Sequence, residues 1–335
     1  MPHSIFATAL RAAVLALGLA PSLAAASALP TQVPAGTRLV VADQNEELQT
    51  QMIASGEHAK LTAAVTYANF LGGPAILEAF RAGALDLATV GNAPPIQAQA
   101  AGETLPIVAA RRSSEPDYSF AVRPGLTVKA LEEFRGKRIA YAEGTGRQPF
   151  VLTALKLAGL TRKDVTLVPL RAADFPDAVR SGQVDIAALN EPHFSRYLAD
   201  YADRGASAVP DAEHDRLPRG LTYLYASGAA LEDPAKAAAI RQFVLGWIAA
   251  NGWSKAHPAD WVAAYYVRKQ KLKEADGLAI VKAAGDIAFP PLESLIAPQQ
   301  ATIDLIYAAG DLKKPLDARE EFDLRFDEVI KAATN

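Results

Sequence analysis

Two segments of the chain repeat one pattern of residues, 99 positions apart. The first runs from Ala79 to Val90 (AFRAGALDLATV) and the second from Ala178 to Leu189 (AVRSGQVDIAAL). Each pattern predicts the end of a helix, a glycine where the helix stops, an aspartate and a short strand. Units of this kind also recur by chance in α/β proteins. We interpret the repeat as two related lobes, in each of which a strand ends at a shared cleft.

The region up to about residue 225 alternates β-rich runs with helical patterns. The clearest strands are 39–42, 87–90, 138–141, 165–168 and 186–189. Pro74 and Pro149 are expected to open helices that stop at Gly83 and Gly159, the usual places for proline and glycine. The alternation predicts an α/β fold with parallel sheets covered by helices. Helical patterns dominate after residue 232, at 233–247, 258–270, 273–284, 298–309 and 318–333.

These patterns predict how the chain is divided. We expect the first lobe to be built in two parts, residues 37–120 and 223–335, and the second lobe from residues 121–222. Extended segments near 118–122 and 221–225 would then be the two crossings between the lobes. The helical tail is expected to pack back on the first lobe.

The first 28 residues read as a removable export signal. Arg11 is the single charge, an apolar run follows at 12–20, and small residues surround Ala26 and Ala28. These are the three parts of a secretory signal, and the run is too short to span a bilayer. We therefore expect a periplasmic protein, cleaved near Ala26 or Ala28. Because the chain has no cysteine, no lipid anchor is expected.

Composition excludes several classes of function. Half of the 335 residues are hydrophobic and the net charge is -3, which argues against disorder and against a nucleic-acid-binding surface. The lack of cysteine excludes disulfides, thiolate nucleophiles and iron–sulfur clusters. The five histidines have no metal-binding spacing, and the chain has no G-x-S-x-G motif. We expect no catalytic residues, no metal and no cofactor.

Four loops carry groups suited to a small anion. The loop 143–148 (EGTGRQ) follows a strand, and its glycines, backbone N–H groups and Arg147 would suit a negative charge. The glycine turn at 71–74 leads into a helix in the same way, and the pairs at 92–93 and 190–191 each end a strand. Each loop alone can be a plain turn, with Arg147 solvated. Together they predict an anion site in the cleft.

Those loops, in that order, resemble the periplasmic solute-binding proteins of transporters for aliphatic sulfonates, taurine and nitrate. The resemblance covers nearly the whole chain after the signal, and GNAPPI (91–96) is its most family-specific part. The matching stretches are 72–80 (GGPAILEAF), 91–100 (GNAPPIQAQA), 134–140 (FRGKRIA), 144–146 (GTG), 158–160 (AGL), 164–170 (DVTLVPL), 182–185 (GQVD), and 316–319 (LDAR) with Phe322.

The resemblance implies a two-lobed periplasmic binding protein fold of type II that closes on its ligand and delivers it to an ABC permease in the inner membrane. One departure concerns Asn190, since many members carry tryptophan there; its loss suggests a ligand more polar or larger than a plain alkanesulfonate. Glu191 either binds a ligand amine or caps its helix. The implied ligand-binding residues, with the two at this loop, are Gln44, Gly73, Asn92, Ala93, Thr145, Gly146, Arg147, Asn190 and Glu191.

The resemblance leaves the ligand open. An aliphatic sulfonate is the first expectation, with taurine or nitrate as alternatives. A second possibility is an enzyme on the same scaffold, of the desulfinase or pyrimidine-precursor synthase type, but the relatives of that kind that we considered use a cysteine that this chain lacks. A third is a sensor or scaffold domain. We expect a monomer that binds a small anion and no nucleic acid.

Overall fold

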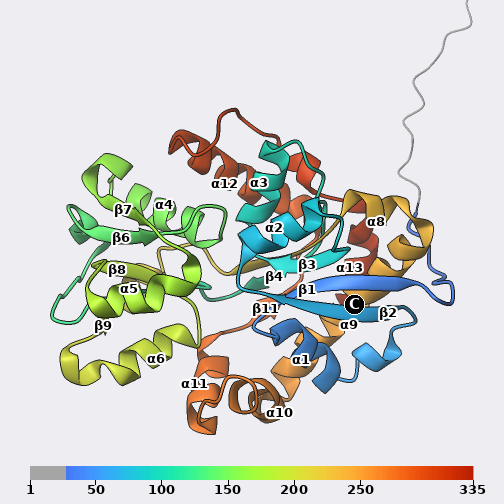
Figure 1. Cartoon of the computed structure of the whole chain (residues 1–335), viewed down its shortest axis with the longest axis horizontal. Coiled ribbons are helices and arrows are strands. Elements are labelled where there is room, and N and C mark those ends of the chain that lie inside the picture. Colours follow the sequence, from blue (N-terminus) through green and yellow to red (C-terminus); the bar gives the residue numbers. More distant parts are fainter. Residues whose placement is uncertain (1–27, 335) are drawn as a thin grey trace, which may run out of the picture.

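The structure, a computed structural model, describes residues 28–334 and contains two β-sheets, each in its own lobe (Figure 1). The predicted signal and its cleavage site fall almost wholly on residues outside this range. Within residues 28–334, no helix is long and apolar enough to cross a membrane.

The sheet of the first lobe has six strands in the order β11-β4-β10-β3-β1-β2. Strands β1, β2 and β3 are parallel, while β10 runs antiparallel to β3 and β4. The strands are β1 (Arg38–Gln44), β2 (Ala64–Phe70), β3 (Leu87–Val90), β4 (Ile107–Ser113), β10 (Leu221–Ala226) and β11 (Ile287–Ala288).

The sheet of the second lobe has five strands in the order β7-β6-β8-β5-β9. Strand β6 is parallel to β7 and β8, and β5 is antiparallel to β8 and β9. The strands are β5 (Ser119–Val122), β6 (Arg138–Tyr141), β7 (Thr166–Pro169), β8 (Ile186–Leu189) and β9 (Ser207–Ala208).

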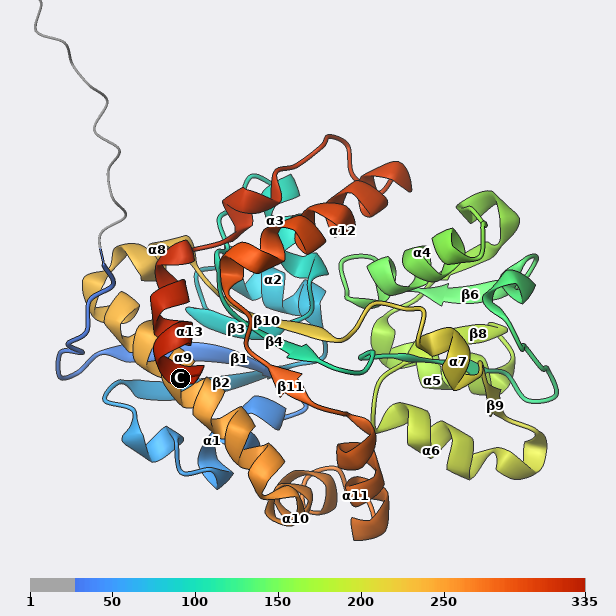
Figure 2. The ribbon, with the colours of Figure 1, turned by 180° about the vertical axis from the view of Figure 1, so that it is seen from behind.

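Helices cover both sheets, as Figures 1 and 2 show from opposite sides. Three of them, α2, α3 and α4, begin in loops that were predicted to bind a ligand. The α-helices are α1 (Glu47–Ala54), α2 (Gly73–Arg81), α3 (Ala93–Ala100), α4 (Arg147–Leu157), α5 (Phe175–Ser181), α6 (His193–Asp200), α7 (Asp211–His214), α8 (Gly228–Glu232), α9 (Pro234–Ala256), α10 (Pro258–Trp261), α11 (Glu274–Ala283), α12 (Ile296–Ala308) and α13 (Asp327–Thr334).

Some boundaries differ from those predicted. Helix α4 begins at Arg147 rather than Pro149, because proline is tolerated throughout a first turn whose N–H groups have no helical partner. Segment 318–333 is two short 3₁₀ turns followed by α13, because Asp323 caps a new turn with its side chain. The sheets are mixed rather than purely parallel, since β5 and β10 enter their sheets antiparallel.

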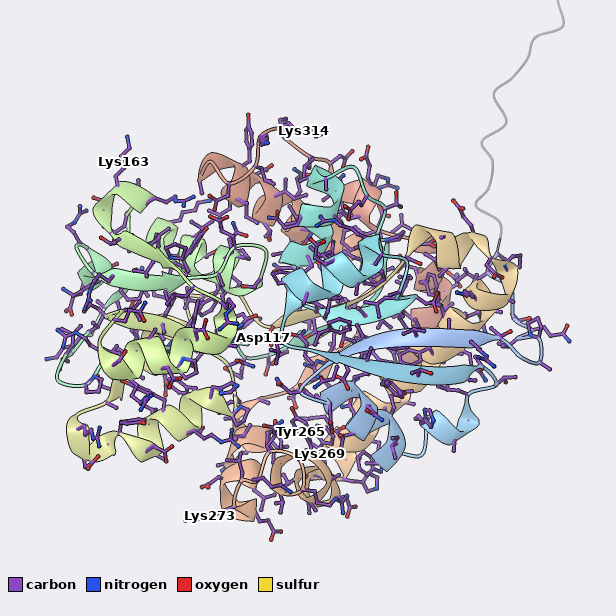
Figure 3. The ribbon with its side chains drawn as sticks, in the orientation of Figure 1. Asp117, Lys163, Tyr265, Lys269, Lys273 and Lys314 are labelled. Carbon is purple, nitrogen blue, oxygen red and sulfur yellow. The ribbon has the colours of Figure 1, made fainter. Side chains whose placement is uncertain are left out.

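The lobes are joined where β4 leads to β5 and where the chain returns to β10. These two connections lie side by side: the Gly220 N–H donates to the Glu115 carbonyl, and the Leu221 N–H donates to Asp117. Figure 3 shows Asp117 between the two halves of the molecule. The boundaries near residues 120 and 222 remain our proposal for dividing the chain.

The tail contacts both lobes. Ile240, Phe243 and Ile330, from α9 and α13, are buried in the core of the first lobe, as predicted. Helix α12 differs, because its Ile303 and Ile306 are buried in a cluster with side chains of α4. The α-helical tail therefore packs on the first lobe and also bridges to the second.

The repeated sequence pattern has an equivalent contact in each lobe. Asp86, just before β3, accepts the Val40 N–H of β1 at 2.8 Å. Asp185, just before β8, accepts the Arg138 N–H of β6, also at 2.8 Å. In both lobes the aspartate N–H also donates to the carbonyl of the same partner residue. The aspartate of the repeat thus joins two neighbouring strands where they begin.

We expect Asp185→Ala to destabilise the second lobe by about 2–3 kcal/mol, because Asp185 bonds Arg123 and Arg138 as well as the Arg138 N–H. Burial opposes its ionisation, but these bonds outweigh burial and hold the pKa of Asp185 well below its usual range. Its stabilising effect is therefore present above about pH 4 and is lost as the pH falls toward the folded-state pKa. Urea unfolding at pH 7 and pH 3 measures this.

In that experiment the exposed Asp177 of the same lobe serves as the control, and Asp177→Ala should change stability by less than about 0.5 kcal/mol. Equal unfolding midpoints for Asp185→Ala and wild type at pH 7 would contradict the assignment.

Candidate functional site

The predicted ligand loops lie where the two lobes meet. A methyl group on Gly73, at the start of α2, would lie 3.4 Å from the Gly144 carbonyl of the second lobe. One on Gly91, after β3, would lie 3.4 Å from the Gly146 Cα atom. Both distances are those of van der Waals contact, so the backbones of the two lobes lie close together at these glycines. The N-terminal ends of α2 and α4 therefore meet in one region.

Arg147 supplies the positive charge of this region. It is the first residue of α4; its Nε donates to the Ala188 carbonyl (3.0 Å) and one terminal nitrogen to Asn190 Oδ1 (2.6 Å). The guanidinium lies over the Tyr118 ring, 4.8 Å from its centre. Burial lowers its pKa, and no carboxylate among the described residues contributes to that shift. A partly buried cation without an acidic partner at a helix N-terminus favours an anion.

Asn92 and Ala93 form the start of α3 in the first lobe. Asn92 is the residue before the helix and Ala93 its buried first residue. Asn92 and its neighbour Gly91 line a cavity of about 70 Å³ together with Gly146 and Tyr118. Residues of two of the four predicted anion loops therefore reach one cavity, beside Asp117 and Gly220 in the connections between the lobes.

The other predicted residues have defined places. Thr145 is buried, and its hydroxyl donates to the Ala142 carbonyl. Gln44 ends β1, and its amide lies 3.4 Å from the Thr89 carbonyl of β3. Asn190 orients Arg147, a role that the comparison with tryptophan had not suggested.

Glu191 was predicted either to bind a ligand amine or to cap its helix, and in the structure it caps α6. Its carboxylate accepts the Ser195 hydroxyl at 2.8 Å and the Ser195 N–H at 3.2 Å, in the first turn of α6. Burial raises the pKa of Glu191 above its ordinary value, although both Ser195 bonds act in the opposite direction. A contact between Glu191 and a ligand amine is the other proposed role.

Two residues near Arg147 were not predicted as site residues. Tyr118 lies in the connection between β4 and β5, and no local motif marks it. His193 was interpreted as an ordinary residue of a helix start, and it is the first residue of α6. Burial lowers its pKa, and the positive charge of Arg147 lowers it further, so the imidazole is neutral at neutral pH.

We expect Gly146→Ala to weaken anion binding about tenfold, because the added methyl would lie 2.6 Å from the Tyr118 hydroxyl oxygen and displace the ring from Arg147. Tyr118→Phe in the same chain removes that oxygen and should restore most of the affinity. Calorimetry on the single and double variants measures this. An equally large loss of affinity in the double variant would show that the Gly146→Ala methyl does not act through the Tyr118 hydroxyl.

No three histidine, aspartate or glutamate side chains in the described part of the chain are grouped so as to hold a metal ion.

Comparison with known proteins gives matches in sequence and in fold. The NMT1/THI5 like family model matches residues 71–214. An aliphatic sulfonates-binding protein of Escherichia coli (strain K12) is 32% identical over 134 residues, which are 40% of this chain and 42% of that protein. The chain thus matches less than half the length of this relative. A protein of the same name from Bacillus subtilis (strain 168) is 25% identical over 78% of this chain and 77% of its own length.

A solved structure shares the fold. The alkanesulfonate-binding protein SsuA from Xanthomonas axonopodis pv. citri, bound to MOPS, superposes with a TM-score of 0.74 at 24% identity, covering 87% of this chain and 99% of that one. This likeness confirms the predicted two-lobed periplasmic binding protein fold. Together with the sequence matches, it confirms the resemblance drawn from the loops. Residues 71–214 therefore resemble the NMT1/THI5-like family, and the relatives found by sequence are named aliphatic sulfonates-binding proteins.

Proposed function

We propose that the protein is the periplasmic substrate-binding component of an ABC transporter and captures a small organic sulfonate between its lobes. The observation that carries this proposal is Arg147, a partly buried cation at the start of α4 without a carboxylate partner among the described residues. The names of the relatives favour a sulfonate as the anion. The permease would be the partner that receives the ligand.

The binding mode follows from the groups around Arg147. Its Nε and one terminal nitrogen are already engaged by the second lobe, which leaves the other terminal nitrogen to meet a sulfonate oxygen. The N–H groups at the starts of α2 and α3 would bind the remaining oxygens, because those of Arg147 and Gln148 in α4 already donate to Thr145. The net charge of -3 gives no general attraction for an anion, so these local donors must supply it.

The direct test is calorimetry on purified protein that has been unfolded and refolded to remove any ligand. Ethanesulfonate, taurine, MOPS and nitrate are titrated separately, with acetate as an anion of different shape. We expect binding of at least one sulfonate, and a thermal shift equivalent to about 2.7 kcal/mol at 100 times its Kd. No heat and no shift with any of these sulfonates would overturn the sulfonate proposal, and nitrate binding alone would replace it.

Binding rather than catalysis is our proposal because the chain has no cysteine and its relatives are named as binding proteins. His193, neutral beside Arg147, is the titratable group nearest to a catalytic role. Incubation with an aryl sulfinate or an alkanesulfonate, followed by assay for released sulfite, separates the two functions. Sustained release of sulfite would establish an enzyme.

A further inference from the structure

A buried chain of polar groups connects α12 to the start of α3. Gln299, on α12, donates its amide to the Asn92 carbonyl at 3.0 Å and to Glu321 at 2.6 Å. The amide oxygen accepts the Tyr223 hydroxyl at 3.1 Å. Gln299, Glu321 and Tyr223 are all at most 3% exposed. The Gln299 side chain is thus fixed in one orientation by partners from three other segments of the chain.

The Asn92 carbonyl and the Ala93 N–H belong to the same peptide group. In a trans peptide these two bonds point in opposite directions. Gln299 holds the carbonyl toward α12, so the Ala93 N–H points away from α12. This N–H is the first of α3 and has no partner within the helix. Gln299 therefore determines where a free donor of the anion region points.

The other end of the same helix is attached to the second anion loop. Asp311, three residues after α12, accepts the Gln148 amide at 2.8 Å, and the Gln148 oxygen accepts the Gly144 N–H at 2.9 Å. Ile303 and Ile306 pack between these two points, in a cluster with side chains of α4. Helix α12, which lies beside α3 in Figures 1 and 2, thus contacts both loops.

We propose that Gln299 is a positioning residue that aims the Ala93 N–H at the bound anion, and that α12, through Gln299 and Asp311, keeps the two anion loops in register. This inference rests on the proposed function. It gives the C-terminal part of the chain a role in ligand affinity although none of its side chains was predicted to contact the ligand.

The test compares Gln299→Met, which keeps the length of the side chain but removes its polar bonds, with Tyr223→Phe, which removes only the hydroxyl that orients the amide. We expect Gln299→Met to weaken ethanesulfonate binding about tenfold and Tyr223→Phe about threefold, the size of effects seen for neutral hydrogen bonds. Tyr307→Gln, at an exposed position of α12, is the matched control and should bind like wild type.

A second readout separates this inference from the proposed function. Hydrogen exchange of the ligand-free protein should be at least about ten times faster in Gln299→Met at residues 96–98, the first residues of α3 whose N–H groups can bond within the helix, and unchanged in β1 and β2. This result is expected whether or not ethanesulfonate binds. If the wild type binds no sulfonate, the function fails while the exchange still tests the positioning role. Wild-type exchange at 96–98, or equally faster exchange across the whole first lobe, would overturn it.

Discussion

Replacing Arg147 by methionine is expected to weaken binding of an organic sulfonate at least about 100-fold, a loss of roughly 3 kcal/mol. Methionine retains a long side chain against the Tyr118 ring but has neither charge nor donors. The loss is large because Arg147 is a partly buried cation at the start of α4, and its hydrogen bond to the sulfonate would be charge-assisted. Calorimetry with ethanesulfonate measures the change.

The same substitution has an informative effect on the ligand-free protein. Because Arg147 has no acidic partner among the described residues, its removal breaks no ion pair and relieves a partly buried charge. We therefore expect the ligand-free variant to melt within a few degrees of wild type, so that lost binding reports on the site and not on unfolding.

Two further variants sharpen the result. Arg147→Lys keeps the charge but loses the planar fork that bonds Ala188 and Asn190, and it should lie between wild type and methionine. Arg171→Ala removes an exposed arginine of the same lobe and serves as the control, with unchanged affinity. Affinity of Arg147→Met within threefold of wild type would exclude Arg147 from the site.

The parts of the fold that could be predicted are those determined by residues close together in the sequence. Strands β3 (87–90), β6 (138–141) and β8 (186–189) have the expected bounds. For β3 and β8 the reason is that a glycine and an aspartate mark where the strand begins. Arg147 was recognised in the same local way, from glycines and a proline around it. Asp86 and Asp185 even make equivalent contacts, as the repeat suggested.

What the sequence did not predict depends on residues far apart in the chain. Tyr118 reaches Arg147 because β5 pairs with β8, a contact that no local pattern indicates. Gln299 and Asn92 are 207 positions apart. Asn190 was read as a missing aromatic wall, whereas its bond to Arg147 depends on two separate loops meeting. Local patterns thus locate the binding loops, and long-range packing determines how their groups are oriented.

The second large effect concerns Glu321, whose side chain is buried. One carboxylate oxygen accepts a hydrogen bond from the Gln299 amide, and the other has no hydrogen-bond partner in the described structure. Burial raises the pKa of Glu321 from its ordinary 4.5 to about 8, although the Gln299 bond acts in the opposite direction. Between pH 4.5 and about pH 8, Glu321 therefore holds a proton in the folded protein that it releases in the unfolded chain. The stabilising effect of this carboxyl is therefore present below about pH 4.5 and is lost as the pH rises through about 8.

Glu321→Gln removes this titration and keeps an oxygen that can accept the Gln299 bond. Relative to the variant, the free energy of unfolding of wild type should fall by about 1.4 kcal/mol per pH unit from pH 5 to pH 8 and then level off, a difference of roughly 4 kcal/mol. Urea unfolding at each pH from 5 to 9 measures it, with the exposed neighbour Glu320→Gln as the control. Because only a buried, protonated carboxyl generates this slope, stability curves that stay parallel for wild type and Glu321→Gln would mean that Glu321 is ionised in the folded protein.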